Sequence, residues 1–295
     1  MLISFLITAY KEPQSIGKCL NTLISKQFLE YAQSQDLDYE ILLACPDSET
    51  LEKARETGLE IIHIQDPARG KPTALNLLLK KAQGDYWIFT DGDCWFDENS
   101  TKNLIAAISK TQAEIFSARP ISGDLKTNFF GYIGHLLADS AHFRRSENTF
   151  FPVSGYFYGL KKQPDLQIPE DCLSDDAYIS YLIYQKTQQI PIYVPQSLVY
   201  IKYATSLKDF YKQKRRSAGG FSQLKEYGFA KVTRSFFEEL KYFQLPLKYA
   251  KNWQELSWSL ALFPIRFWLW VLIFWDRKIL KKSFKDTWQR VESTK

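Results

Sequence analysis

Short apolar runs alternate with amphipathic segments along the first third of the chain. Runs with the length and composition of β-strands cover residues 2–8, 40–44, 60–64 and 86–90. Segments with apolar residues at a helical period lie between them, at residues 15–29, 48–57 and 73–82. Strands and helices in this alternation are typical of a parallel, doubly wound α/β sheet.

The middle of the chain has a less regular pattern. It predicts helices over residues 99–110, 129–146 and 174–185, and strands over residues 115–120 and 194–201. The late strand leaves room for an antiparallel or mixed addition to the sheet. The chain has 295 residues, enough for one large domain with an appendage. We place the α/β domain at residues 1–220 and a separate helical region at residues 221–295.

The C-terminal region is basic and rich in aromatic residues. Residues 201–295 hold 20 Lys and Arg against 8 Asp and Glu, whereas residues 1–200 hold 18 against 25. Residues 256–275 are apolar over about twenty positions, the length that crosses a bilayer. Pro264 and Arg266 inside this run equally fit a helix at the level of the lipid headgroups. We favour membrane attachment over a buried core helix, because the run is apolar on all sides.

The cysteines and the N-terminus indicate the compartment. Cys19, Cys45, Cys94 and Cys172 are scattered, which is typical of free thiols in a reducing compartment. The apolar start of the chain is short and lacks a basic leader, so we take it as a first strand rather than a signal peptide. We therefore expect the protein at the cytoplasmic face of the cell membrane.

Two carboxylates separated by one glycine end the fourth predicted strand. Asp91 and Asp93 lie where open α/β sheets bind their ligands, just outside the carboxyl ends of the strands. Carboxylate oxygens suit a hard cation such as Mg²⁺ or Mn²⁺. Taken alone, however, the pair is more simply explained as a solvated turn.

Polar residues also follow the other predicted strands. Tyr10, after the first strand, could stack on a base or lie in an ordinary turn. Asp47, after the second strand, could accept hydrogen bonds from a uracil or a ribose, or could cap the next helix. Arg69 and Lys71 flank Gly70 at a helix start, where a phosphate could bind. The spacing excludes a Walker loop.

These motifs, in this order and at these intervals, resemble the inverting glycosyltransferases of family 2, which have the GT-A fold. The matching motifs are Ala9-Tyr10-X-Glu12, Asp47, Gly70-Lys71-X-X-Ala74-Leu75-Asn76 and Asp91-X-Asp93. The resemblance covers residues 2–98 and implies a divalent cation, Mn²⁺ or Mg²⁺, bound by Asp93 and Asp91. It also implies a nucleotide-sugar site that includes Thr8, Tyr10, Glu12, Asp47, Lys71, Asn76 and Asp91.

An acidic pair later in the chain resembles the catalytic pair of the same family. In Ser174-Asp175-Asp176 the resemblance implies that Asp176 is the catalytic base and that Asp175 lies on the acceptor side. Neighbouring carboxylates can raise each other's pKa, as a base requires. Without the resemblance we would interpret the pair as helix capping. Gly155, after Ser154, resembles the family's glycine turn on the acceptor side.

A basic cluster resembles the Gln-X-X-Arg-Trp motif of processive polysaccharide synthases. The resemblance assigns Gln213 and Arg216 to the nucleotide-sugar site, where arginine would neutralise charge on the diphosphate. Ser217 stands where Trp is usual, which puts processive polymerisation in doubt. Equally, the cluster could face lipid headgroups.

We therefore predict a metal-dependent inverting glycosyltransferase. It would move a sugar from a nucleotide-diphosphate donor, a UDP-sugar first of all, to a hydroxyl of a lipid-linked or polysaccharide acceptor of the cell envelope. One alternative is a sugar-1-phosphate nucleotidyltransferase, although the glycine-rich loop expected after its first strand is absent. Another is a non-catalytic membrane-bound protein with a degenerate transferase fold. Binding of nucleic acid by the basic tail is disfavoured, because the long apolar run favours lipid.

Overall fold

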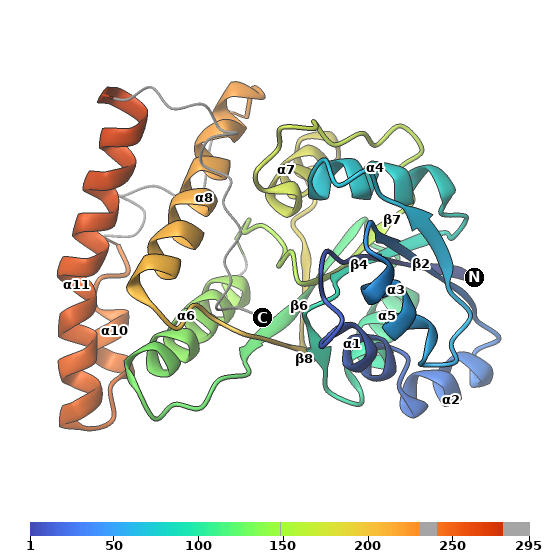
Figure 1. Cartoon of the computed structure of the whole chain (residues 1–295), viewed down its shortest axis with the longest axis horizontal. Helices are drawn as coiled ribbons and strands as arrows, with labels where there is room; N and C mark the ends of the chain where they lie inside the picture. Colours follow the sequence, from blue (N-terminus) through green and yellow to red (C-terminus); the bar gives the residue numbers. More distant parts are fainter. Residues whose placement is uncertain (148, 230–240, 280–295) are drawn as a thin grey trace.

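The computed structural model describes residues 1–147, 149–229 and 241–279, and its centre is a mixed sheet of eight strands (Figure 1). The strands lie in the order β3-β2-β1-β4-β7-β6-β8-β5. Their bounds are β1 Leu2–Thr8, β2 Asp38–Cys45, β3 Ile62–Gln65, β4 Tyr86–Asp91, β5 Trp95–Phe96, β6 Ile115–Ser122, β7 Phe157–Lys161 and β8 Ile192–Ile201. Strands β3, β2, β1 and β4 are parallel, as predicted.

The predicted addition to the sheet is mixed. β7 pairs antiparallel with both β4 and β6, so β6 runs parallel to β4 although the two are not neighbours. β8 pairs parallel with β6, and the short β5 closes the edge antiparallel to β8. The carboxyl ends of β1 and β4 therefore open toward the segment that precedes β7, which carries the predicted acceptor-side glycine.

Helices cover both faces of the sheet. Their bounds are α1 Ile16–Leu23, α2 Lys26–Ser34, α3 Ser48–Arg55, α4 Lys71–Lys81, α5 Ser100–Thr111, α6 Phe129–Ser146, α7 Asp175–Thr187, α8 Leu207–Glu226, α10 Leu245–Tyr249 and α11 Trp253–Phe274. Along β1, Ile3 and Phe5 pack into the core under α1, α2, α3 and α5, whereas Leu6 packs into the core under α4 and α7. A strand with both faces covered explains the continuous apolar run at the start of the sequence.

The prediction of one helix over residues 15–29 is wrong. The structure divides the segment into α1 and α2 at Ser25. The Ser25 hydroxyl accepts a hydrogen bond from the Phe28 backbone N–H, and it donates one to the Glu98 carbonyl. Because this side chain caps α2, it restarts the helix in a new direction that the apolar pattern does not show.

A group of helices, α6, α8, α10 and α11, lies beside the α/β part, on the left of Figure 1. Tyr132 of α6 is fully buried and exchanges a hydrogen bond of 2.6 Å with Ser259 of α11. The predicted division between residues 220 and 221 falls inside α8. Gly220 approaches the start of α7 so closely that a Cβ there would lie 2.6 Å from Ser174 Oγ. α8 thus connects the helical group with the segment that carries Asp175 and Asp176.

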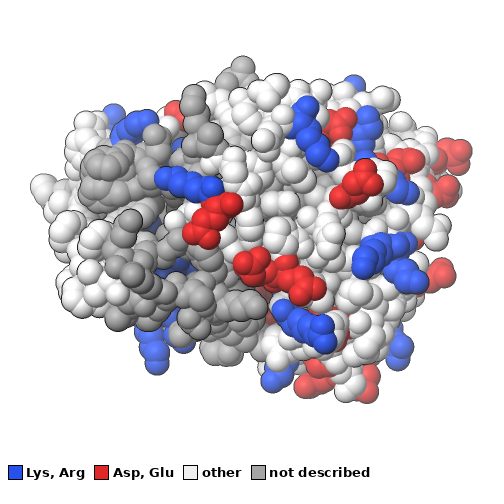
Figure 2. Space-filling view, turned by 90° about the horizontal axis from the view of Figure 1, so that it is seen from above, with Lys and Arg blue, Asp and Glu red and all other residues white. Residues whose placement is uncertain are grey.

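The α11 helix is apolar but largely exposed. Within the described ranges it is the one helix long and apolar enough to cross a membrane. The exposed fractions of Trp253, Leu260, Phe267 and Phe274, each seven residues apart, are 87%, 54%, 63% and 59%. Charged side chains mix over the α/β part, whereas the edge that α11 forms is mostly uncharged in the view of Figure 2. Residues 230–240 and 280–295 of the predicted C-terminal region lie outside the described residues.

Candidate active site

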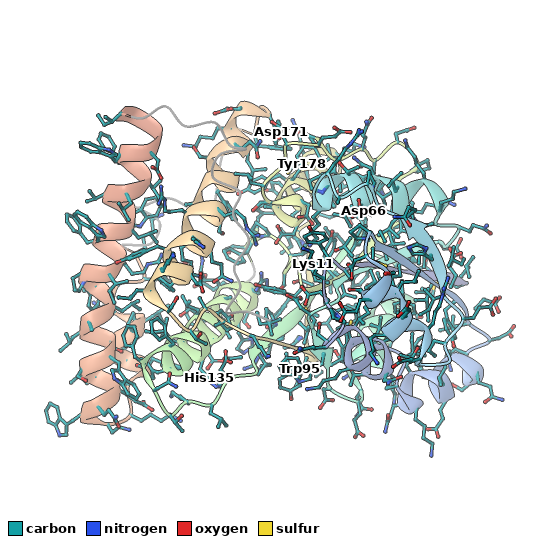
Figure 3. The ribbon with its side chains drawn as sticks, in the orientation of Figure 1. Lys11, Asp66, Trp95, His135, Asp171 and Tyr178 are labelled. Atoms are coloured by element: carbon teal, nitrogen blue, oxygen red, sulfur yellow. The ribbon has the colours of Figure 1, made fainter. Side chains whose placement is uncertain are left out.

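A large cavity opens at the carboxyl ends of β1 and β4, with a volume of about 1320 Å³. Most of the predicted site residues line it, from six different parts of the chain. They are Thr8, Tyr10, Glu12, Lys71, Asp91, Asp93, Gly155, Asp175, Asp176, Gln213 and Arg216. Lys11, beside Tyr10, lies near the middle of the molecule in Figure 3. The structure therefore brings together residues that are more than two hundred positions apart in the sequence.

The parallel register of β1 and β4 positions Asp91. Thr8 and Asp91 are paired residues at the ends of these strands. The Thr8 hydroxyl donates a hydrogen bond of 2.9 Å to Asp91 Oδ1, and Lys71 Nζ at the start of α4 lies 2.8 Å from the same oxygen. This carboxylate is thus neutralised and held in one orientation, which suits a group that positions a ligand hydroxyl.

Asp93 differs from Asp91 in its surroundings. It forms no ion pair with the residues that the structure describes. Burial, and then the nearby Asp91 and Glu12 carboxylates, raise the pKa of Asp93 to about 7. A divalent cation would remove this penalty by pairing with the ionised carboxylate.

The donor set fits a hard cation that takes only part of its ligands from protein. In the described part of the chain no three His, Cys, Asp or Glu side chains converge as a closed metal cage. Mg²⁺ commonly binds one or two carboxylates and fills its other positions with water and substrate phosphates. Asp93, with Asp91 beside it, offers that kind of open site within the cavity.

Lys71 links the two sides of the cavity. Its Nζ lies 2.8 Å from Asp91 Oδ1 and 3.4 Å from Asp175 Oδ2. Burial alone would lower the pKa of Lys71, but the Asp175 and Asp91 carboxylates outweigh it and raise the pKa. Lys71 therefore stays cationic at all working pH values and fixes the strand-end carboxylate relative to the start of α7.

Asp176 occupies the first turn of α7 and faces the loop before β7. Its Oδ2 accepts a hydrogen bond of 3.0 Å from the Gly155 backbone N–H. Burial, followed by the charge of Asp175, raises the pKa of Asp176 to about 6. A carboxylate with a raised pKa that is still ionised near neutral pH has the properties of a general base.

Gly155 leaves no space for a side chain, and this gives a prediction. A Cβ at this position would lie 2.9 Å from Asp176 Oδ2 and 3.0 Å from its Cγ. Gly155→Ala should therefore displace the carboxylate and lower kcat by roughly 10- to 100-fold, because small displacements of reacting groups are costly. Steady-state transfer kinetics would measure this.

Gly17→Ala is the matched control, because the nearest atom to its added Cβ is 3.8 Å away. It should leave kcat unchanged. Equal losses of activity in both variants would show a general effect on folding, rather than a displacement of Asp176.

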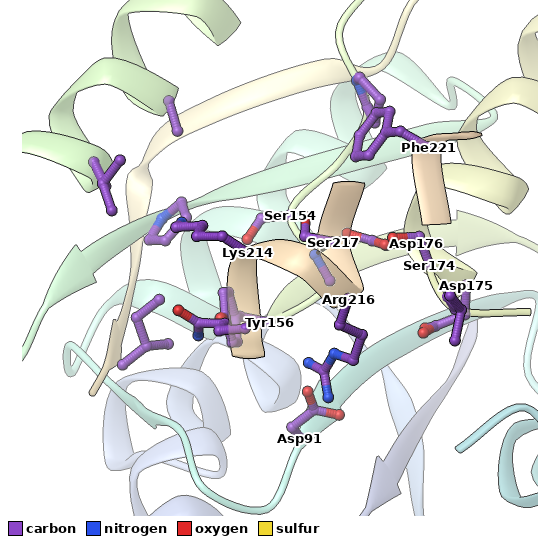
Figure 4. Close-up of a pocket in the computed structure, with 18 of the residues that line it drawn as sticks. Asp91, Ser154, Tyr156, Ser174, Asp175, Asp176, Lys214, Arg216, Ser217 and Phe221 are labelled. Atoms are coloured by element: carbon purple, nitrogen blue, oxygen red, sulfur yellow. Dashed lines mark hydrogen bonds between the residues drawn. The ribbon is translucent and has the colours of Figure 1, made fainter. Parts of the chain in front are cut away.

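α8 carries the predicted basic motif into the cavity. The Arg216 guanidinium points toward the Asp91 carboxylate in Figure 4, and Gln213 lines the cavity one turn earlier. The neighbouring Arg215 forms an ion pair with Asp276, which lies two residues after the end of α11. Arg215 therefore connects α8 with the segment that follows α11, whereas Arg216 presents a cation to the cavity.

Two predicted site residues lie outside the cavity lining. Asp47 caps α3 by accepting a hydrogen bond from the Thr50 N–H, and also accepts one of 2.8 Å from the Lys11 N–H. It thus shapes the loop that presents Tyr10. The Asn76 side chain exchanges hydrogen bonds of 2.7 and 2.9 Å with the Ile168 backbone. This clamp holds α4 against the segment that leads to α7.

The cavity also contains residues that the sequence did not single out. Arg144, Arg145 and Tyr156 line it beside Gly155. The two arginines lie in the last turn of α6, where basic residues are expected for the helix dipole alone. Their place next to the loop that carries Gly155 depends on tertiary packing, and no local sequence pattern predicts it.

Comparison with known proteins identifies relatives of the chain. The model of glycosyl transferase family 2 matches residues 4–166. The chain is 23% identical over 256 residues to the poly-β-1,6-N-acetyl-D-glucosamine synthase of Staphylococcus aureus (strain COL), covering 83% of this chain and 59% of the synthase. It is 22% identical over 214 residues to the glycosyltransferase GlyA of Streptococcus pneumoniae serotype 4, covering 66% of this chain and 30% of GlyA.

A solved structure agrees with the fold. The mannosyltransferase PcManGT from Pyrobaculum calidifontis, in complex with GDP-Man and Mn²⁺, superposes with a TM-score of 0.61 at 17% identity. The match covers 95% of this chain and 88% of PcManGT, and it confirms the predicted GT-A fold. The chain spans about three fifths of the length of the synthase that it matches. Since the family model covers more than half of the residues, the chain belongs to glycosyl transferase family 2.

Proposed function

We propose that the protein is a metal-dependent inverting glycosyltransferase that uses a nucleoside-diphosphate sugar, with UDP-sugars as the first candidates. The acceptor is a hydroxyl of a lipid-linked or glycan molecule. One observation carries the proposal: a single cavity has the carboxylates Asp91 and Asp93 on one side and the raised-pKa carboxylate Asp176 on the other. A donor and an acceptor could thus meet between them.

The residues suggest a role for each part of the cavity. Tyr10, 41% exposed at its rim, stacks on the base, and Asp91 binds a donor hydroxyl. Asp93 holds the cation, which when bound stabilises negative charge on the diphosphate. Arg216 adds a second positive charge beside the leaving group. The GDP-Man and Mn²⁺ in PcManGT support a donor and a cation of these classes.

The bond changes then follow from the position of Asp176. The acceptor oxygen attacks the anomeric carbon from the face opposite the diphosphate, and the bond from that carbon to the diphosphate oxygen breaks. The nucleoside diphosphate leaves with the electron pair, and the acceptor proton moves to Asp176. Attack from the opposite face inverts the anomeric configuration. The Gly155 N–H keeps the carboxylate turned toward the cavity.

A donor screen tests the proposal directly. Release of the nucleoside diphosphate would be measured with UDP-, GDP- and dTDP-sugars in the presence of Mn²⁺ or Mg²⁺. With one of these donors, we expect wild-type protein to release the nucleoside diphosphate faster than the Asp176→Ala variant does. Pyrophosphate released from a nucleoside triphosphate and a sugar-1-phosphate would instead identify a nucleotidyltransferase, and no turnover with any donor would favour a non-catalytic protein.

The pKa of Asp176 predicts the acid limb of the activity profile. Because the ionised carboxylate accepts the proton, kcat should be constant above about pH 7 and should fall as the pH drops through about 6. Kinetics between about pH 4.5 and 8 at saturating donor would measure this. An acid limb near the ordinary carboxyl pKa would show that Asp176 is not the group that titrates.

We also propose that α11 attaches the protein to the cytoplasmic face of a membrane. Trp253, Leu260, Phe267 and Phe274 form the exposed stripe of α11. This stripe offers large apolar side chains to a bilayer. Nucleic acid is a poor partner for such a surface. Whether the helix lies on the bilayer or crosses it, the stripe faces lipid in this proposal.

A double variant of the stripe tests the attachment. Leu260→Glu with Phe267→Glu should lower binding to phosphatidylglycerol vesicles by at least tenfold, because each buried apolar side chain contributes about 1.5–3 kcal/mol. Vesicle flotation would measure this. Leu125→Glu is the control, since Leu125 is 79% exposed in the loop before α6. If Leu125→Glu detached the protein equally, α11 would not be the membrane-binding element.

A further inference from the structure

The cavity extends well beyond the space that a donor would fill. From Gly155 it continues between α6, α8, α10 and α11, and this extension is called the apolar arm. Lys214 of α8 and Arg266 of α11 also line the cavity here. Its apolar walls include Leu137 and Ala141 of α6, Pro246 of α10, and Leu262, Phe263 and Trp270 of α11. A hydrophilic glycan would gain little from these side chains, whereas a hydrocarbon chain would bury apolar surface against them.

Arg145 lies where the apolar arm meets the loop that carries Gly155. Its Nε donates a hydrogen bond of 3.2 Å to the Pro152 carbonyl. Its Nη1 is buried and has no hydrogen-bond partner among the described residues. A buried cation with an unused donor is costly unless an anion pairs with it. No carboxylate within the described ranges forms an ion pair with Arg145.

The loop after α6 connects this cation rigidly to the proposed base. The Val153 N–H donates to Ser180 Oγ and the Ser154 N–H donates to Ser117 Oγ, each at 3.0 Å. The next N–H, that of Gly155, donates to Asp176. Arg145 is also close enough for its charge to oppose, in part, the rise in the pKa of Asp176. An anion on Arg145 would therefore lie beside the accepting group.

The surface beyond the apolar arm is also apolar. Phe267 belongs both to the wall of the cavity and to the exposed stripe of α11. A chain in the arm would therefore continue toward the surface that is proposed to face the bilayer. Asp176, Arg145, the apolar arm and the exposed stripe of α11 follow one another along this path. A cation followed by apolar surface matches the head and tail of an anionic lipid.

We propose that the acceptor is a lipid phosphate, with its phosphate on Arg145 and its hydrocarbon chain in the apolar arm. This rests on the proposed function, since Asp176 must then accept a proton from a hydroxyl carried near that phosphate. Charge complementarity selects an anionic head, and the walls of the arm select a long apolar tail over a glycan.

Binding of full-length protein to vesicles tests the proposal without a donor. Phosphatidylcholine vesicles would carry phytanyl monophosphate, phytanol as the uncharged control, or phosphatidylglycerol at a negative charge matched to that of the phytanyl monophosphate. We expect wild-type protein to bind the phytanyl monophosphate vesicles about tenfold more tightly than either control. A terminal phosphomonoester can form a charged hydrogen-bonded pair with Arg145, whereas phytanol has no charge and the phosphodiester of phosphatidylglycerol is monoanionic and substituted on both sides. Inorganic phosphate at the same concentration should not displace the lipid.

Variants separate the two parts of the site. Arg145→Gln should lose the preference for phytanyl monophosphate and keep its binding to phosphatidylglycerol. Arg55→Gln, which removes the same charge from the exposed end of α3, should keep the preference. Ala141→Phe fills the apolar arm without removing a charge and should also lose the preference. Thermal unfolding of each variant would confirm that it folds, and Ala141→Phe keeps the test decisive if Arg145→Gln does not.

Several results would overturn the proposal. They are equal binding of wild-type protein to the three vesicles, a preference that survives in both Arg145→Gln and Ala141→Phe, and displacement of the lipid by inorganic phosphate. Transfer to a soluble glycan, with no preference for lipid phosphate, would assign the acceptor to glycans. UDP binding with Mn²⁺ would be measured on the same samples. Intact UDP binding without lipid preference would overturn this inference alone, whereas failure with every donor would overturn the proposed function.

Discussion

Asp176→Asn is expected to lower kcat by roughly 10²- to 10⁴-fold, the usual effect of losing a general base. Asparagine has nearly the same shape as aspartate, and its carbonyl oxygen can still accept the hydrogen bond from the Gly155 N–H. It cannot take a proton from the acceptor. The loop should therefore keep its conformation while the chemical step fails. Single-turnover kinetics with saturating donor would measure the change.

Nucleotide binding should be nearly unaffected by Asp176→Asn, because Asp91 and Asp93, the carboxylates assigned to the donor, lie at and just after the end of β4. Calorimetric titration with UDP and Mn²⁺ would check this. Asp175→Asn is the informative comparison. Asp175 is 8% exposed and pairs with Lys71, which also holds Asp91, so its loss should weaken donor binding as well. A loss of nucleotide affinity in Asp176→Asn equal to that in Asp175→Asn would count against the role of Asp176 as base.

The first half of the sheet could be predicted from the sequence, because each of its strands is a separate apolar run with polar residues at its end. Thr8 and Asp91 end two such runs, and the parallel register brings them together. The positions of Tyr10, Lys71 and Asp93 in one cavity follow from the same geometry. Asp47 was open between two interpretations, and the structure shows the helix cap.

Elements that depend on tertiary packing were not predictable in this way. β7 has only five residues, and Gly159 at its centre weakens the local preference for a strand. A Cβ there would lie 3.0 Å from Ile108 Cδ1, so α5 packs closely over the glycine and a larger residue would have to displace that side chain. α8 contains Gly219 and Gly220, which are poor helix formers, and close packing against α7 stabilises the helix there.

The acceptor side was the least predictable part of the site. The contact between Gly155 and Asp176 joins residues from a loop and a helix that share no local pattern. The family resemblance located both residues, but not the hydrogen bond between them. The unpaired Nη1 of Arg145 becomes visible only when the loop after α6 is folded. The packing of α6, α7 and α8 brings these distant residues together, and a local sequence pattern does not predict such packing.

Removal of divalent cations is the second change with a large expected effect. EDTA should abolish transfer, and Asp93→Asn should lower kcat/KM by about a thousandfold, which corresponds to about 4 kcal/mol. The physical reason is the loss of the positive charge that offsets the diphosphate. Asparagine keeps the volume of Asp93 but carries no charge for a cation. Steady-state kinetics over a range of Mn²⁺ concentrations would measure both effects.

Binding measurements distinguish a cation site at Asp93 from a merely structural role. In wild-type protein, Mn²⁺ should strengthen UDP binding in a calorimetric titration, and Asp93→Asn should remove most of that increase. Asp97→Asn is the matched control, because Asp97 lies outside the cavity lining and accepts a hydrogen bond from the Asn99 N–H. It should retain the increase. Full transfer in EDTA would exclude a required cation, and the raised pKa of Asp93 would then reflect burial and its acidic neighbours alone.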